Sequence, residues 1–567
     1  MRIIVKAALA GASILALGVA GIAAAQQTAP AAGQSAATAP IKVAAGATEV
    51  MAEMRDKVKL AGNLYVPAGK GPFPCIVQRT PYGKDAMFAN PAQMKKYTDD
   101  GIAYMVQDVR GKGRSEGFYQ AFINDAFDGY DTVEWMAKQP WCNGKIGIMG
   151  ASAMGYTTML AATMKPPHLK AAFSIVTPST RLTGSYIGGA FKQKDSGDWS
   201  RGQGIAEDVI QQNAINYPAS SYWDRTEIAD QRKYINIPVY SLGGWYDIFN
   251  EGNVRNFMYL QHEGADGARG NQKLEMGPFG HGNLSGDMEY PQGGSLGGSP
   301  NEMRWWDYWL KGVDNGIMKE PPVTYFMMGA GEKGQPASPD VRVLHADNWP
   351  PASRKTRFYL TPAKTLTLDA PASAKPQKIS YKFDPAHPVP TVGGANLLAP
   401  AGPKDQREIP ARPDYLRFET APLDRPVAIA GNVTVELYGA TDGLDTDFMA
   451  KLVDVYPDGY EAIVLDAPIR TRYRHGFMAD QVELMKPNAP DKLTIDLWDT
   501  AITFAKGHKI ALHISSSSSP KYEINPNTGE APAFTAKLKP RVATNSIYMD
   551  AEHPSALVLP VVDAGGK

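Results

Sequence analysis

Ser152 stands where a serine can act as a nucleophile. An apolar run that ends at Met149 predicts a buried strand, and a helical pattern begins at Met154, so Ser152 lies in the turn between them. Such a turn holds its serine in strained backbone and needs small neighbours, which Gly150 and Gly155 provide. The spacing is G-x-S-x-x-G rather than G-x-S-x-G, so the motif alone fits an ordinary serine in a strand–helix turn equally well.

A serine nucleophile needs a histidine that takes its proton and a carboxylate that orients the histidine, and in α/β proteins the acid precedes the histidine. Asp247 follows the predicted strand Ile237–Leu242 on a Gly-Gly bend, a place that also suits a cap for a helix beginning at Asn250. His281 follows the next predicted strand, whereas His262 falls inside a predicted helix. We therefore expect Asp247 and His281 to complete a triad, with His262 as the alternative base.

Acyl transfer also needs hydrogen-bond donors at the oxyanion that forms during the reaction. The backbone N–H of Ala153 lies at the start of the predicted helix and is one such donor by geometry. Tyr82 follows the predicted strand that begins at Cys75, and its phenol is the candidate second donor. Packing is the alternative role for Tyr82, since most tyrosines near loops serve it.

Short motifs along the whole chain carry a resemblance to a known family. They are Met54–Asp56, Arg79–Gly83, Asp108–Gly117, Asp128–Asp131, Gly150–Gly155, Gly243–Asp247, Gly277–His281, Trp306–Gly316, Asp454–Gly459, Arg470–Arg474, Gly507–His508 and Ser518–Pro520. Together they resemble the cocaine esterase and X-prolyl dipeptidyl-peptidase (CocE/NonD) family of α/β-hydrolases, which is related to glutaryl-cephalosporin acylases and α-amino-acid ester hydrolases.

This resemblance implies an α/β fold class, with an α/β-hydrolase domain, an inserted helical cap and a C-terminal jelly-roll β-sandwich. It implies that Ser152 is the nucleophile, that Asp247 and His281 are its partners, and that Tyr82 and the Ala153 amide form the oxyanion hole. The implied activity is hydrolysis of carboxylic esters or amides through an acyl-enzyme. X-Pro dipeptidyl-peptidase and β-lactam side-chain acylase or α-amino acid ester hydrolase activities are alternatives, and a surface-binding protein with a degenerate site is a remote one.

The chain departs from the family pattern at residues near the predicted site. Ala153 replaces the usual tyrosine, Phe279 replaces the usual tryptophan, and Phe249 and Asn250 replace acids of the members that select α-amino acyl groups. A buried ammonium group needs nearby carboxylates, so we expect a largely apolar pocket that prefers neutral or aromatic acyl groups. Other acids that could serve an amine are Glu251, Asp195 and Asp198.

The elements that must position these residues alternate between strands and helices. The predicted strands include Cys75–Val77, Ile102–Val106, Ile146–Met149 and Ala171–Ile175. Their alternation with helices predicts a parallel sheet in an α/β-hydrolase domain formed by residues 47–180 and 237–335. Residues 181–236 are polar and rich in aromatics, which predicts a helical cap over the strand ends. Short alternating strands predict a jelly-roll β domain in residues 336–567.

The N-terminal segment predicts export. Arg2 and Lys6 precede an apolar run that ends in Ala23–Ala25, so residues 1–25 have the layout of a cleaved signal peptide and residues 26–46 that of a disordered spacer. An uncleaved anchor helix is the alternative, but the run is short for a membrane span. We expect a periplasmic or secreted protein, in which Cys75 and Cys142 could form a disulfide.

Composition excludes several classes of partner. Lys and Arg together number 58, as do Asp and Glu, so no net charge favours nucleic acid. Two cysteines and nine scattered histidines predict no metal site, and no cofactor is expected. Gly111–Gly117 fits a tight turn better than a dinucleotide loop, and Asp442, Asp445 and Asp447 fit a solvated turn better than a calcium loop. The expected partner is a small ester or amide, and self-association is left open.

Overall fold

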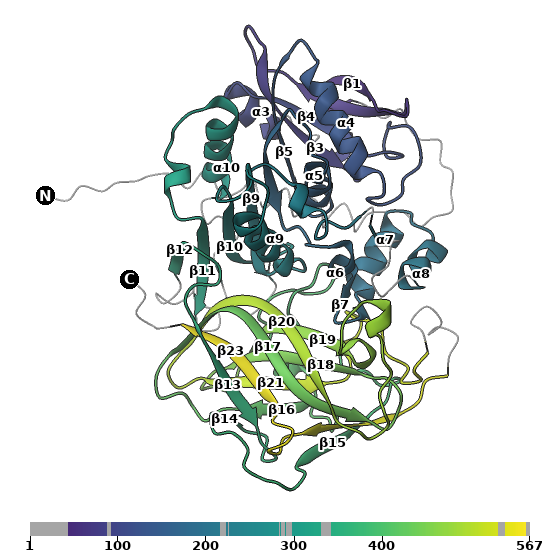
Figure 1. The fold of residues 1–567 in the computed structure, drawn as a ribbon, viewed down its shortest axis with the longest axis vertical. Coiled ribbons are helices and arrows are strands. Elements are labelled where there is room, and N and C mark those ends of the chain that lie inside the picture. Colours follow the sequence, from purple (N-terminus) through teal and green to yellow (C-terminus); the bar gives the residue numbers. More distant parts are fainter. Residues whose placement is uncertain are drawn as a thin grey trace, which may run out of the picture.

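The computed structural model describes residues 43–87, 92–215, 223–224, 226–282, 284, 288, 290, 298–329, 342–530 and 539–562. The predicted signal peptide and most of the predicted spacer lie outside these residues. Within them, no helix combines the length and apolar character needed to cross a membrane. Figure 1 shows an α/β domain stacked on a β domain, with the segment that carries α6, α7 and α8 at their boundary.

A mixed sheet forms the centre of the α/β domain. From edge to edge it contains β1 (Thr48–Glu53), β2 (Lys59–Tyr65), β4 (Ala103–Asp108), β3 (Phe73–Thr80), β5 (Cys142–Ala151), β6 (Leu169–Ile175), β9 (Val239–Tyr246), β10 (Lys273–Gly280), β11 (Val323–Gly329) and β12 (Arg342–Ala346). The strands from β4 to β11 are parallel, and β1, β2 and β12 pair in antiparallel fashion. The carboxyl ends of β5, β9 and β10 therefore meet along one edge of the sheet.

Helices cover both faces of this sheet. They are α2 (Lys84–Met87), α3 (Ala92–Asp99), α4 (Asp125–Ala137), α5 (Ala153–Thr163), α9 (Asn250–His262) and α10 (Gly298–Trp306). On one face Ile148 packs with Met136 of α4 and Leu160 of α5, and on the other Phe173 packs with Trp306 of α10. Successive side chains of a strand point to opposite faces, and both faces are covered, so the central strands are apolar throughout.

The segment between β6 and β9 contains more than the predicted helices. It consists of α6 (Arg181–Ser185), β7 (Tyr186–Ile187), β8 (Ala190–Phe191), a π-helical turn (Gln193–Gly197), α7 (Asp198–Gly202), α8 (Glu207–Ile215) and a 3₁₀ turn (Arg232–Tyr234). The β7–β8 hairpin turns at Gly188, which has φ 52° and whose carbonyl accepts the N–H of Arg470 at 2.7 Å. A Cβ on Gly188 would lie 2.0 Å from the Pro468 carbonyl oxygen, so glycine permits this contact with the β domain.

Two sheets that share one core form the β domain. One contains β13 (Arg354–Leu360), β14 (Leu366–Thr367), β15 (Lys378–Phe383), β17 (Val427–Thr441), β20 (Asp491–Phe504), β22 (Ala543–Tyr548) and β23 (Ala556–Val562). The other contains β16 (Leu416–Glu419), β18 (Asp447–Val455), β19 (Glu461–Arg470) and β21 (Lys509–Ser515). Leu437, Leu452 and Leu512 meet in the core between them. The jelly-roll connectivity stays a prediction.

The predicted solvated turn was wrong for two of its three acids. Asp445 and Asp447 are fully buried. Asp445 accepts a hydrogen bond from Arg472 at 2.8 Å, and Asp447 accepts one from Arg470 at 2.9 Å. The sequence pattern could not show that the end of β19 returns to these acids, whose charges are balanced by the two guanidinium groups.

The disulfide that the export signal suggested is not formed in the structure. Cys75 on β3 and Cys142 on β5 are both buried free thiols. They lie close enough for one thiol to hydrogen-bond the other, and the Cys75 Sγ also contacts the Phe73 carbonyl at 3.3 Å. The proximity of the two cysteines that a disulfide requires is present, but the covalent bond between them is not.

Candidate active site

Ser152 lies at the sharp turn between β5 and α5. Its backbone has φ 60° and ψ −125°, which L-residues adopt at a cost. The turn requires the glycines beside it, since a Cβ on Gly150 would lie 2.4 Å from the backbone of Met154, and one on Gly155 would lie 2.0 Å from the Thr177 hydroxyl. The strand and helix thus approach as the motif predicted despite its extra residue.

A continuous hydrogen-bond chain joins Ser152, His281 and Asp247. His281 Nε2 lies 2.7 Å from the Ser152 Oγ, and His281 Nδ1 lies 2.8 Å from Asp247 Oδ2. Asp247 follows β9, and His281 follows β10. Ser152, His281 and Asp247 are 7%, 2% and 0% exposed, so water competes little for these contacts. The alternative base His262 is exposed at the end of α9, so that alternative was wrong.

The second oxygen of Asp247 has its own donor. Asp247 Oδ1 accepts the backbone N–H of Phe249 at 2.7 Å, so the carboxylate is held on both sides. The N-cap of α9 is Phe249, without a side-chain cap hydrogen bond, so the alternative that Asp247 caps this helix was wrong. A fixed carboxylate selects the imidazole tautomer that carries its proton on Nδ1 and leaves Nε2 free to accept the Ser152 proton.

Two candidate oxyanion donors adjoin Ser152, one as its neighbour in the chain and one as a hydrogen-bond partner. Ala153 is the first residue of α5, so its N–H has no acceptor within the helix. Tyr82 lies within hydrogen-bonding reach of Ser152, and Tyr82 Oη accepts the indole N–H of Trp199 at 3.1 Å. Burial raises the pKa of Tyr82 to about 12, which keeps its phenol protonated as a donor. These two groups are the candidate donors to an oxyanion at Ser152.

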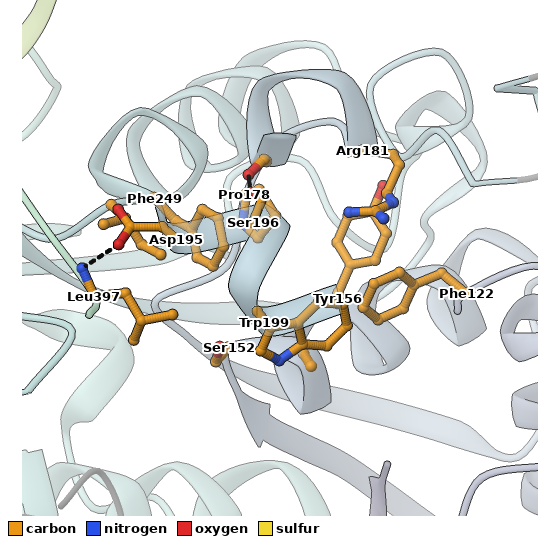
Figure 2. Close-up of a pocket in the computed structure, with 13 residues that line it drawn as sticks. Phe122, Ser152, Tyr156, Pro178, Arg181, Asp195, Ser196, Trp199, Phe249 and Leu397 are labelled. Atoms are coloured by element: carbon orange, nitrogen blue, oxygen red, sulfur yellow. Dashed lines mark hydrogen bonds between the residues drawn. The ribbon is translucent and has the colours of Figure 1, made fainter. Parts of the chain in front are cut away.

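A pocket opens beside Ser152. Its lining residues are Phe122, Ser152, Ala153, Tyr156, Pro178, Arg181, Gly184, Asp195, Ser196, Trp199, Ile248, Phe249 and Leu397. Phe249 packs edge-on against the His281 ring, with 5.4 Å between the ring centroids. Figure 2 shows Asp195 and Leu397 on one side of the pocket and Arg181 with Phe122 and Tyr156 on the other. The pocket is mainly apolar, as expected, but its lining includes one acidic residue, Asp195, and one basic residue, Arg181.

The candidate acids for an amine lie in different surroundings. Asp195 lines the pocket. Glu251 is buried and accepts the Ser179 hydroxyl at 2.7 Å, and Asp198 pairs on the surface with Lys194 at 2.9 Å. Asn250 donates its amide to the Asp499 carbonyl at 2.8 Å. Of the acids that the sequence suggested, Asp195 therefore faces the pocket.

Comparison with known proteins identifies the family. Residues 56–218 and 201–283 match the model of the X-Pro dipeptidyl-peptidase S15 family, and residues 315–558 match that of the X-Pro dipeptidyl-peptidase C-terminal non-catalytic domain. The chain is 31% identical to the cocaine esterase of Rhodococcus sp. (strain MB1 Bresler), over 91% of this chain and 98% of that protein. The chain belongs to the CocE/NonD and X-Pro dipeptidyl-peptidase family. Its relatives are hydrolases, and it is a hydrolase.

Further known proteins and solved structures match over most of the chain. A putative Xaa-Pro dipeptidyl-peptidase of Bacillus anthracis is 24% identical, over 78% of this chain and 73% of that protein. An α-amino acid ester hydrolase structure has a TM-score of 0.78 and 26% identity, covering 94% of this chain and all of that one. An aminopeptidase structure from a Thaumarchaeota archaeon has a TM-score of 0.79 at 23% identity, covering 94% and 99%, and shows the shared fold.

The sequence did not assign the pocket roles of several residues of this CocE/NonD family member. Trp199 and Arg181 lie in the segment 181–236 that was predicted to form the cap, and neither carried a signal of a pocket role. Leu397 comes from the β domain. Its role in the pocket could not be predicted, because leucine is common throughout protein interiors and a single leucine in a loop does not indicate which cavity it lines. In the described part of the chain, no group of three or more His, Cys, Asp or Glu side chains is arranged to hold a metal ion.

Proposed function

We propose that this protein is a serine hydrolase that cleaves carboxylic esters through an acyl-enzyme. The observation that carries the proposal is the chain from Ser152 Oγ through His281 to Asp247, built at a strained turn beside two oxyanion donors. The family relationship supports it, because the Rhodococcus relative is a cocaine esterase.

The proposed reaction has two stages. Ser152 Oγ attacks the carbonyl carbon of the substrate while His281 Nε2 takes the hydroxyl proton, and Tyr82 and the Ala153 N–H donate to the oxyanion. Collapse of the tetrahedral intermediate breaks the ester bond, and the proton on His281 passes to the leaving alcohol. Water then attacks the acyl-enzyme, giving its proton to His281, and the second collapse restores the Ser152 hydroxyl.

We further propose that neutral or aromatic acyl groups are better substrates than free α-amino acyl groups. Phe249 and Asn250 carry no negative charge that could neutralise an ammonium group, and the buried Glu251 carboxylate accepts a hydrogen bond from the Ser179 hydroxyl. One observation favours the X-Pro dipeptidyl-peptidase or acylase alternative, because Asp195 lines the pocket and its Oδ2 has no hydrogen-bond partner among the described residues. Values of kcat/KM for a neutral acyl nitrophenyl ester, its α-amino acyl counterpart and an X-Pro anilide decide between them.

The test of the serine mechanism is labelling with a fluorophosphonate followed by peptide mapping. Stoichiometric labelling of Ser152, together with hydrolysis of p-nitrophenyl esters, is the expected result. An adduct at another residue contradicts the assignment, and absence of labelling with no turnover favours a non-catalytic protein. Ser152→Ala is the matched control and takes up no label.

We also propose export with cleavage after Ala25. The support is the sequence pattern of residues 1–25, since Arg2 and Lys6 precede an apolar run and Ala23–Ala25 suit a signal peptidase. N-terminal sequencing of the protein recovered from the periplasm or medium of a bacterial host tests this. A mature chain that begins at Gln26 is expected, and an intact Met1 in the cytoplasmic fraction would contradict it.

A further inference from the structure

Arg181 supplies a cationic group to an otherwise mainly apolar pocket. It is the first residue of α6, it is half-buried, and it lines the same pocket as Ser152. Its guanidinium lies over the Phe122 ring, with 5.3 Å from Cζ to the ring centroid. Figure 2 shows it beside Tyr156 and Phe122, across the pocket from Asp195.

The guanidinium of Arg181 lacks a carboxylate partner. Among the residues that the structure describes, its side-chain hydrogen bond runs from Nη1 to the Ser185 hydroxyl at 3.0 Å, and no acid forms an ion pair with it. The other donors of its planar fork are therefore available to a group in the pocket. An arginine half-removed from water without a counter-ion is a ready site for an anion.

The groups around Arg181 do not neutralise it. Tyr156 directs its hydroxyl to the Thr226 carbonyl. Glu227 interacts electrostatically with Arg181, but the hydrogen bonds that its carboxyl accepts come from the backbone N–H groups of Arg181 and Leu182, the latter at 3.3 Å, and not from the guanidinium. Burial raises the pKa of Glu227 to about 8, which weakens its attraction for Arg181 near neutral pH. Glu227 therefore offsets the positive charge of Arg181 only in part, and the guanidinium donors stay available to a substrate.

Aromatic rings fix the position of this charge. Phe122 stacks on Trp199 with 6.0 Å between centroids and 5° between planes, and it meets Tyr156 edge-on at 4.7 Å. Arg181 therefore packs on Phe122, which is itself held between Tyr156 and Trp199. The indole N–H of Trp199 also donates to Tyr82. Because these neighbours already restrict the Arg181 side chain, it loses little conformational entropy when it binds an anion.

We propose that Arg181 is a specificity-determining residue that binds a carboxylate carried by the part of the substrate in this pocket. The inference rests on the proposed serine hydrolase function and names its substrate class: esters of dicarboxylic acids, or esters whose alcohol part bears a carboxylate. A planar guanidinium with free donors matches a carboxylate in bidentate geometry.

Asp195 does not cancel this attraction. It lies on the opposite side of the pocket, where its Oδ1 accepts the N–H groups of Leu397 and Leu398 at 3.0 and 3.1 Å. Buried Lys192 interacts electrostatically with Asp195 and offsets part of its charge. The two sides of the pocket therefore differ in charge, and a carboxylate is directed to the Arg181 side.

The test compares esters that differ only in charge. The acyl series contains mono-p-nitrophenyl adipate, its neutral methyl ester and the cationic p-nitrophenyl 6-aminohexanoate. The alcohol series contains the butyrate esters of 4-hydroxybenzoate and of its methyl ester. In wild-type protein we expect kcat/KM for the carboxylate to exceed that for the methyl ester about tenfold to a hundredfold in one series, which identifies the half of the substrate in the pocket.

Variants assign that preference to Arg181. In Arg181→Gln we expect the ratio of kcat/KM for the carboxylate ester to that for the methyl ester to fall to within about threefold of one. Arg181→Lys should keep part of the carboxylate preference, because lysine carries the positive charge but lacks the planar set of guanidinium donors. The matched control is Arg201→Gln on α7, whose guanidinium pairs with Glu207 and Asp198 outside the pocket. This control keeps the wild-type ratio. Fluorophosphonate labelling of Ser152 verifies that each variant assembles its site.

Each outcome decides the proposal. The proposal is overturned if wild-type protein shows no carboxylate preference in either series, or if a carboxylate preference survives Arg181→Gln. If Arg181→Gln fails to label, Arg181→Lys decides, and an unchanged ratio in that variant overturns the proposal. Failure of the proposed function is distinct, since the wild-type protein would then neither label nor hydrolyse any of the esters.

Discussion

Replacing Tyr82 by phenylalanine tests the oxyanion arrangement most directly. The change keeps the ring in its partly buried site and removes one of two donors near Ser152, the other being the Ala153 N–H. An oxyanion donor acts mainly in the transition state, and its loss costs about 2.7–4 kcal/mol, or about 10²- to 10³-fold in kcat. KM should change little, because the ground-state carbonyl gains less from this donor.

Trp199 makes the prediction sharper. Its indole N–H donates to Tyr82 Oη at 3.1 Å, which turns the phenolic hydrogen away from Trp199. Trp199→Phe removes a hydrogen bond with a net value of about 0.5–1.5 kcal/mol and should lower kcat about twofold to tenfold. Trp199 is a positioning residue in this scheme, so the same change made in Tyr82→Phe should have almost no further effect on kcat.

The assay is steady-state hydrolysis of p-nitrophenyl butyrate by wild-type protein, both single variants and the double variant. Fluorophosphonate labelling of Ser152 checks folding, and Phe122→Leu serves as the packing control for Trp199, since it alters the ring stack without touching the indole N–H. A Tyr82→Phe variant with kcat within about threefold of wild type would show that Tyr82 only packs. Independent, additive effects of the two changes on kcat would refute the coupling through the phenol.

Three further outcomes are expected. Ser152→Ala should lose ester hydrolysis while its Tm stays within a few degrees, and residual turnover near the wild-type rate would refute the nucleophile. Because the pKa of Tyr82 is raised to about 12, kcat should not fall through loss of this donor near pH 10, and a decline there that is absent from Tyr82→Phe would contradict this. Burial raises the pKa of Glu227 from 4.5 to about 8, so the folded state binds more protons than the unfolded state and stability falls as pH rises through this window. Glu227→Gln should reduce that fall by up to about 1.4 kcal/mol per pH unit in denaturant titrations, and equal pH slopes would disprove it.

The elements predicted from the sequence are those that rest on local patterns. The apolar run before Ser152 became β5, and the Gly-Gly bend before Asp247 became the end of β9, because burial on both faces requires such runs. The geometry of Ser152, Asp247 and His281 followed from strand ends that a parallel sheet must bring together.

Long-range partners were outside the reach of the sequence. The burial of Asp445 depends on Arg472, and the docking of the β7–β8 hairpin depends on Arg470, and no periodicity encodes either pairing. Arg181 was missed for the same reason, since its position relative to Ser152 is set by folding of the cap, whereas Asp195 was among the acids that the sequence suggested. Local rules predict elements, whereas tertiary contacts decide which side chains share a cavity.

The contact between Asp195 and Leu397 has a consequence for how the enzyme becomes active during synthesis. Leu397 and Leu398 are added to the chain long after Ser152, Asp247 and His281, yet their N–H groups hold the pocket acid, and Leu397 forms part of the pocket wall. The Asn250 side chain, close to Asp247, is likewise held by the later Asp499 carbonyl. A ribosome-bound chain that has completed only its α/β domain therefore lacks one wall of the pocket. Synthesis of the segment around Leu397, and not folding of Ser152, Asp247 and His281 alone, completes this wall of the pocket.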